Sequence, residues 1–363
     1  MIDDNRYRPD QILLSYFVKY TRLEYLSNSL LPLFNKYNFI DIYIDIFSLL
    51  KKLYNTDIYT NKALSITSCI MNLAAHLRGF YRSRYNKHSR IFIIYSDEEY
   101  DYQRQFYPLY GKNEYKNTIN YAKNNKLILS QLELVKILCG YIYDIYFISK
   151  HNIFTLVAYD LIMKNIKDNS LSILISESKY PFIVTSLIQN HSVFNIRPLK
   201  IKGEDQSQLI DPESIYRTYY SKINQNDTDL IYKLNSINPA LLSVIWSLNG
   251  CNNINVSALT NIKRTVNMIY DGINNLKIIN NYNPDPIMIY NGLTNVHNVI
   301  DLDSFILRFK AIDLLYQYHI YINSPEILDN TWFINLQDPN TVRDINNKYF
   351  KDNPLDLENL YSY

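Results

Sequence analysis

Acidic side chains follow apolar runs of the sequence in an arrangement that suits a magnesium site. In chain order they are Asp45, Asp97, Glu98, Glu99 and Glu177. If the runs are parallel strands of one sheet, their carboxyl ends meet at one edge, where ligands bind in such folds. Carboxylates gathered there could hold two Mg²⁺ ions about 4 Å apart and cleave phosphodiesters. The same acids could instead be solvated loop residues or helix N-caps.

Basic residues gather in two stretches with aromatic residues between them. The first contains Arg78, Arg82, Arg84, Lys87 and Arg90, with Phe80, Tyr81 and Tyr85. The second contains Arg104, Lys112 and Lys116 around Phe106–Tyr110. Cations that neutralise phosphates beside rings that stack on bases are typical of a nucleic-acid groove. A solvated helix end is the alternative.

A third candidate is the stretch Leu248–Ile269, which predicts two short helices joined by a loop. Gly250 predicts the end of the first helix, and the second is expected to begin near Asn261. Amides at a helix start, together with Lys263 and Arg264, would present positive charge to a phosphate. An ordinary helical hairpin is the alternative.

These candidates depend on an α/β arrangement of strands and helices. Apolar runs at 39–48, 90–96, 171–176 and 193–199 predict strands, most of them buried on both faces of a parallel sheet. Helical spacing predicts helices over 49–54, 63–85, 127–146 and 153–166. We therefore expect an N-terminal helical extension (1–38), an α/β domain (39–210) and a mainly helical region (211–363). The tail after Asn323, broken by prolines, is expected to wrap around the body.

Composition excludes several classes of protein. The chain of 363 residues has 7 glycines, where average usage gives roughly 25, so no Gly-rich phosphate loop can be built. Cys69, Cys139 and Cys251 lie far apart and follow no metal spacing, which argues against disulfides and zinc. The net charge of +2 confines any nucleic-acid surface to a local patch. No membrane-spanning run or signal peptide is visible, so a cytoplasmic protein without membrane contact is expected.

The order of these pieces resembles the flap-endonuclease and phage 5'-3' exonuclease family, over about residues 39 to 275. Ile42-Tyr-Ile-Asp45 is similar to the family's first strand, and Ile91–Asp97 to its second. Arg104 followed by Tyr107-Pro-Leu-Tyr-Gly-Lys112 resembles its R-x-x-Y-P-x-Y-K element. Residues 241–272 resemble the helix-three-turn-helix that grips duplex DNA. The resemblance implies a PIN-like (FEN-like) fold, with Asp45, Asp97, Glu98 and Glu177 as metal ligands and Mg²⁺ as the cofactor of an active enzyme.

The chain departs from this family at several ligand positions. Residues 153–159 carry no acid where the family has a Glu-rich helix. Ser178 and Tyr180 stand where two metal-binding aspartates are expected. In the helix-three-turn-helix, Ala258-Leu-Thr260 replaces the Gly-hydrophobic-Gly turn.

We therefore expect a catalytically degenerate member of the family, encoded by an AT-rich virus or phage, that binds DNA or assembles with other viral proteins and needs no cofactor. In this hypothesis the DNA contacts are Arg78, Arg82, Arg84, Lys87, Arg90, Arg104, Lys112, Lys263 and Arg264. One alternative is an active Mg²⁺-dependent 5' nuclease that uses Asp45, Asp97, Glu98, Glu99 and Glu177. The other is a virion or scaffold protein that binds no DNA.

Overall fold

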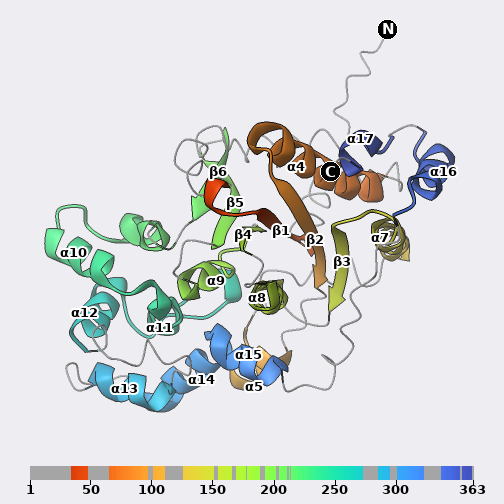
Figure 1. The fold of residues 1–363 in the computed structure, drawn as a ribbon. Coiled ribbons are helices and arrows are strands. Elements are labelled where there is room, and N and C mark those ends of the chain that lie inside the picture. The colour runs from red at the N-terminus through yellow and green to blue at the C-terminus, as the bar shows by residue number, and fades with distance from the viewer. Residues whose placement is uncertain are drawn as a thin grey trace, which may run out of the picture.

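A computed structural model of the chain describes residues 34–47, 65–96, 101–110, 126–150, 154–165, 169–176, 178–188, 193–201, 204–210, 212, 214–272, 285–294, 301–322, 337–351 and 354–361. In these residues a six-stranded sheet has the order β3-β2-β1-β4-β5-β6 (Figure 1). Its strands are β1 (Phe39–Asp45), β2 (His88–Ser96), β3 (Ile145–Lys150), β4 (Ser170–Ile175), β5 (Val193–Ile201) and β6 (Glu204–Ile210). Strands β1 to β5 are parallel and β6 is antiparallel to β5. The predicted parallel α/β fold is confirmed.

Strand β1 is the buried centre of the sheet, between β2 and β4. On one face its alternating residues are isoleucines, and on the other they are Asp41, Tyr43 and Asp45. Asp41 is fully buried and receives two hydrogen bonds from the Arg90 guanidinium, at 2.6 and 2.7 Å. The ring of Tyr43 stacks on Phe92 of β2 at a centroid distance of 4.8 Å. Cross-strand pairs of this kind fix the register of a sheet.

Helices cover both faces of the sheet, as right-handed crossovers require. The connections from β1 through β2 to β3 place α4 (Ser65–Tyr85) and α7 (Lys126–Cys139) on one face. The connections from β3 to β4 and on to β5 run the opposite way and place α8 (Phe154–Asn165) and α9 (Phe182–Leu187) on the other. Helix α5 (Asp101–Phe106) follows β2 at the carboxyl edge of the sheet.

A helical region follows β6 and packs at the carboxyl edge of the sheet, where α14 contacts α5 and α15 contacts α8 (Figure 1). Its elements are η3 (Ile215–Lys222), α10 (Thr228–Ser236), η4 (Pro239–Leu241), α11 (Leu242–Asn249), η5 (Asn252–Ile254), α12 (Ile262–Gly272), α13 (Pro286–Thr294), α14 (Leu302–Ile312) and α15 (Leu314–Ile322). No helix among the described residues is long and apolar enough to cross a bilayer.

The segment 337–361 returns to the α/β domain. It contains α16 (Pro339–Tyr349) and α17 (Leu357–Leu360), and α17 packs against α4. Asn72 of α4 donates to the carbonyl of Pro354 and accepts from the amide of Asp356. This part of the predicted tail therefore packs on the α/β domain through α17, although the predicted boundary at residue 211 places it in the helical region.

Other sequence expectations differ from the structure at particular elements. The predicted helix 127–146 ends at Cys139, because Gly140 and the left-handed Asp144 (φ 58°) form a turn that leads into β3. The polar sequence of strand β6 lacks a strand signature, so the sequence does not predict this strand. Residues 1–33 of the predicted N-terminal extension and the predicted helix 49–54 lie outside the described residues.

Candidate functional site

Asp45 lies at the carboxyl edge of the sheet, as predicted, but its carboxylate is turned into the protein. The residue is 2% exposed. One carboxylate oxygen accepts a hydrogen bond from the Ser176 hydroxyl at 2.7 Å, and the other accepts from the Phe47 amide at 3.0 Å. Ser176 directly follows β4 and also accepts from the Ser178 amide at 3.1 Å. Asp45 thus ties the ends of neighbouring strands together.

The other predicted acids, Asp97, Glu98, Glu99 and Glu177, lie outside the described residues. Within the described residues, no group of three or more His, Cys, Asp or Glu side chains could hold a metal ion. A two-magnesium centre needs several carboxylates whose oxygens face the ions. The described donors at this edge amount to one buried carboxylate engaged with a serine and an amide, and they do not fit such a centre.

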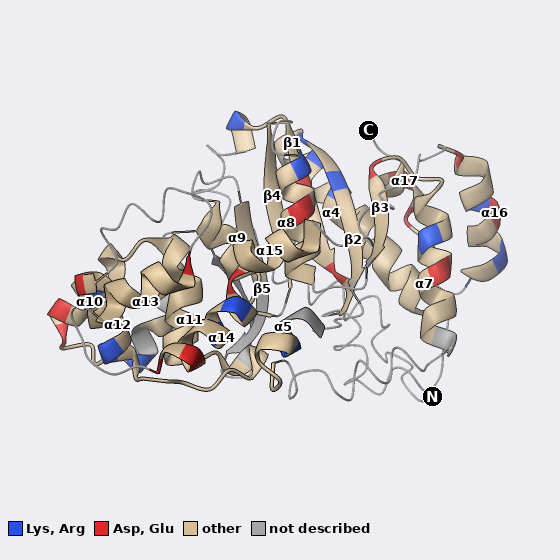
Figure 2. Cartoon of the chain, turned by 90° about the horizontal axis from the view of Figure 1, so that it is seen from below, with Lys and Arg blue, Asp and Glu red and all other residues tan. Residues whose placement is uncertain are grey.

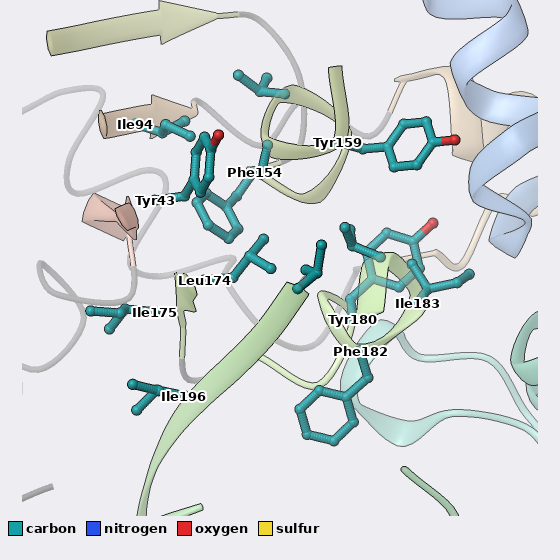
Figure 3. Packing of buried hydrophobic residues seen from close by; sticks show 14 of the residues in the cluster. Tyr43, Ile94, Phe154, Tyr159, Leu174, Ile175, Tyr180, Phe182, Ile183 and Ile196 are labelled. Carbon is teal, nitrogen blue, oxygen red and sulfur yellow. The ribbon is translucent and has the colours of Figure 1, made fainter. Parts of the chain in front are cut away.

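Tyr180 occupies a position where the resemblance predicts a metal-binding aspartate, and it is a packing residue. Its ring stacks on Trp246 of α11 at 5.9 Å and meets the ring of Tyr110 edge-on at 6.3 Å. Its hydroxyl donates to the carbonyl of Ile312 at 2.8 Å, and burial raises its pKa. Figure 3 shows it among buried hydrophobic side chains such as Ile183. Tyr180 therefore joins the carboxyl edge of the sheet to the helical region.

Helix α8 lies in the stretch where the resemblance predicts an acidic helix, and its one acid serves packing. Asp160 is 3% exposed. It pairs with Lys164 at 2.7 Å and accepts from the Tyr318 hydroxyl of α15 at 3.2 Å. Lys164 belongs to α8 itself and Tyr318 belongs to α15, so Asp160 connects the helical region to the α/β domain.

The helix–loop–helix predicted around residues 248–269 is present, as α11, a short loop and α12. Gly250 has φ 78°, and a Cβ there would lie 2.6 Å from the Ala258 nitrogen, so only glycine fits. The amides of Leu259 and Thr260 both donate to the carbonyl of Leu248, at 2.8 and 3.0 Å. These loop amides therefore hold the loop itself together.

The start of α12 presents two cations. The Asn261 side chain caps the helix by accepting a hydrogen bond from the Arg264 amide at 2.9 Å. This amide, one of those predicted to face a phosphate, is therefore already bonded within the protein. The Lys263 side chain is 66% exposed and pairs with Asp227 at 3.0 Å, while Arg264 is exposed. The hydrogen bond from Lys263 is the main reason that the pKa of Asp227 is lowered.

The turn after α5 docks on this helix–loop–helix through contacts that sequence reasoning missed. The Tyr107 hydroxyl lies 3.2 Å from that of Ser257, and Asn255 donates to the carbonyl of Leu109 at 2.9 Å. Arg308 of α14 donates to the carbonyl of Ser257 and lies over the Tyr107 ring at 5.4 Å. No motif marks Arg308 in the sequence. The predicted contact Arg104 donates to the Tyr110 carbonyl within this turn at 3.1 Å, and Lys112 lies outside the described residues.

The first basic stretch does not join this site. It spans the end of α4 and the start of β2, and is therefore at the amino edge of the sheet, whereas the helix–loop–helix packs at the carboxyl edge. Arg78 is 4% exposed and donates to the carbonyls of Leu360 and Tyr143, so its assignment as a surface DNA contact is wrong. Arg90 is paired with Asp41. Arg82 is exposed and Lys87 half-buried, and the Arg84 side chain is not described.

No protein-family model matches this sequence, and a search of curated proteins finds none similar to it. Solved structures from bacteriophage T5 are similar in fold. The T5 D15 protein crystallised with metal ions has a TM-score of 0.49 and 12% identity, over 78% of this chain and 92% of that one. The T5 flap endonuclease in complex with DNA and metal ions has a TM-score of 0.47 and 13% identity, over 89% and 99%. T5 5'-exonuclease with zinc has a TM-score of 0.44 and 13% identity, over 78% and 92%.

The described residues of this chain form an α/β fold with a parallel sheet flanked by helices. Its parallel sheet, the turn after α5 and the helix–loop–helix follow one another in the order that the sequence resemblance predicted.

Proposed function

We propose that this protein binds the backbone of duplex DNA through its helix–loop–helix and does not cleave DNA efficiently. The observation that carries the second half is the state of Asp45. Both of its oxygens accept hydrogen bonds inside the protein, and the tyrosine at an expected ligand position fills space between the sheet and α11. At the described residues of this edge, Asp45, Ser176 and Tyr180 make contacts within the protein that need no metal ion.

Repulsion between two Mg²⁺ ions explains why one carboxylate is too few for two-metal cleavage. Two unit charges 4 Å apart interact with about 4 kcal/mol at an effective dielectric constant of 20, so two dications repel by about 16 kcal/mol. Several carboxylates must compensate that repulsion. The described residues of this edge supply Asp45, and its interactions already stabilise the fold without a metal.

The DNA-binding half rests on the exposed cations at the start of α12. Lys263 and Arg264 lie beside a loop held by its own backbone hydrogen bonds and next to the helix N-terminus, whose dipole favours an anion. The pair between Lys263 and Asp227 is on the surface and contributes little, so a phosphate can replace the aspartate as the partner of Lys263. Such contacts would recognise backbone and not sequence.

A gel assay tests the proposal. A 5'-flap and a nicked duplex are each incubated with the protein in Mg²⁺, in Mn²⁺ and in EDTA, and both shift and cleavage are scored. We expect a salt-sensitive shift without cleavage, weakened at least tenfold in Lys263→Glu/Arg264→Glu. The matched control is Arg343→Glu/Lys348→Glu, which changes two exposed cations of α16 by the same charge.

The other outcomes separate the alternatives. Cleavage that is lost in EDTA and in Asp45→Ala would instead favour the alternative of an active Mg²⁺-dependent nuclease with Asp45 in its site. Neither shift nor cleavage would favour a structural or scaffold protein.

A further inference from the structure

The first basic stretch, at the end of α4 and the start of β2, lies apart from the helix–loop–helix and forms a separate surface at the amino edge of the sheet. Contacts connect its parts. The Lys87 amine donates to the carbonyl of Tyr37 at 2.8 Å, and Asn169 donates to the carbonyl of Lys36 at 3.4 Å. The Asn86 amide donates to the Arg82 carbonyl at 2.9 Å. We call Lys36, Arg82, Asn86, Lys87 and Asn169 the amino-edge patch.

The two described acids beside the strands at this edge, Asp41 and Asp144, are buried and already paired, so they do not neutralise the cations of the patch. Asp41 is bound to Arg90, and Asp144, 4% exposed, is bound to His88. Among the described residues no acid forms an ion pair with Lys36, Arg82 or Lys87. One exposed acid, Glu358, lies on α17, which packs on α4, and it offsets part of this positive charge. Figure 2 shows basic residues on the ribbon near β1 and α4, at the end of the sheet away from α5 and α11.

The chemistry of the patch fits a phosphodiester backbone better than a protein. Its members are Lys and Arg cations and two exposed asparagines, whose amides are hydrogen-bond donors. None of the exposed large hydrophobic side chains among the described residues belongs to it. Protein interfaces need aromatic or apolar anchors at their centre, whereas backbone contacts to nucleic acid come from Arg, Lys and Asn.

We propose that the amino-edge patch binds the backbone of a second nucleic-acid segment, so that one molecule holds two segments at opposite ends of its sheet. The first segment is the one assigned to the helix–loop–helix, and in that respect the proposal rests on the proposed function. The patch itself is assigned from its own charge and geometry.

A bridging assay with the full chain tests this. Donor-labelled and acceptor-labelled 30-bp duplexes are mixed with the protein, energy transfer between them is measured, and mass photometry counts chains and duplexes per complex. We expect transfer and complexes of one chain with two duplexes. In Lys36→Glu/Arg82→Glu the transfer should fall at least tenfold while binding of one duplex remains. The control Arg343→Glu/Lys348→Glu, with the same charge change on α16, should bridge like the wild type.

Salt dependence supplies a second readout. Each lost phosphate contact removes about 0.9 from the slope of log K against log salt, so two contacts change the slope of the second binding step by about 1.8. Melting temperatures of the variants check that the fold is intact.

The proposal is overturned if the wild type binds one duplex without bridging, or if Lys36→Glu/Arg82→Glu bridges normally. Capture of polyglutamate without any binding of duplex would assign the patch to acidic proteins and also overturn it. The two assignments fail separately. If Lys263→Glu/Arg264→Glu binds DNA normally while the patch variant does not bind, the helix–loop–helix assignment falls and the patch remains a nucleic-acid site.

Discussion

Asp313 offers a quantitative test of how the helical region is held together. It lies between α14 and α15 and is 2% exposed. One oxygen accepts from the Ser243 hydroxyl at 2.8 Å and the other from the Tyr316 amide at 2.9 Å. Burial raises its pKa from 3.8 to about 6, although these hydrogen bonds partly oppose the shift. The folded protein therefore binds a proton here more tightly than the unfolded chain does.

The sign and size of the effect follow from linkage. A raised pKa contributes stability that is fully present below the unfolded value, near pH 4, and is lost as the pH rises to about 6. The shift is 6 − 3.8, or about 2 pH units, and each unit corresponds to 1.36 kcal/mol, giving about 3 kcal/mol. Asparagine carries no charge at any pH. It replaces one acceptor oxygen by an amide group, which costs about 1 kcal/mol.

We therefore expect Asp313→Asn to be about 2 kcal/mol more stable than the wild type at pH 8 and about 0.5 kcal/mol less stable at pH 4, where the unfolded carboxyl is already about half ionised. Urea unfolding at both pH values measures the difference. The control is Asp303→Asn on α14, whose exposed side chain stays in water in both states. A stability difference between Asp313→Asn and the wild type that is the same at pH 4 and pH 8 would refute the reasoning.

Other variants test other parts of the structure. Arg78→Met should lower the free energy of unfolding by about 2 to 4 kcal/mol, because one buried and one part-buried carbonyl lose a charged donor, whereas Arg82→Met, one turn on and exposed, should change it by less than about 0.5 kcal/mol. Equal effects of these two variants in urea unfolding would contradict the burial of Arg78. Asp41→Leu should cost about 3 to 5 kcal/mol by leaving the Arg90 charge uncompensated, and Asp41→Leu/Arg90→Met should recover most of that loss. A double variant as unstable as the sum of the single ones would argue against this pairing. Gly250→Ala should weaken DNA binding and stability together, since its Cβ would press on the Ala258 nitrogen. Normal binding and a normal melting temperature would show that the loop adapts.

The parts of the fold that could be predicted were those with a strong local signal. Strand β1 was predictable because isoleucines alternate through it, and Asp45 could be placed at the carboxyl edge because that strand ends there. The helix–loop–helix was predictable because Gly250 marks the turn. Strand β3 was missed because its short sequence continues the apolar spacing of α7.

What the sequence could not show were partners supplied from far along the chain. Arg78 stands in a run of basic residues that predicts an exposed surface, but its acceptor on α17 is 282 residues away. Tyr180 follows a strand where an acid was expected, and only the position of Trp246 on α11 shows what fills that space. Arg308 likewise gains its role from the turn that carries Tyr107. The contacts of these three side chains depend on elements far away in the sequence, and the local sequence pattern carries no sign of them.

The return of α17 to α4 has a consequence for synthesis of the protein. Arg78 cannot reach its full set of acceptors until the ribosome has made Leu360, 282 residues later. At 5 to 20 residues per second this takes roughly 15 to 60 s. During that interval one side of α4 stays open, with a cation beside apolar surface. The α/β domain is thus completed after the helical region has been translated, and a nascent chain stalled before α16 would be a natural target for chaperones.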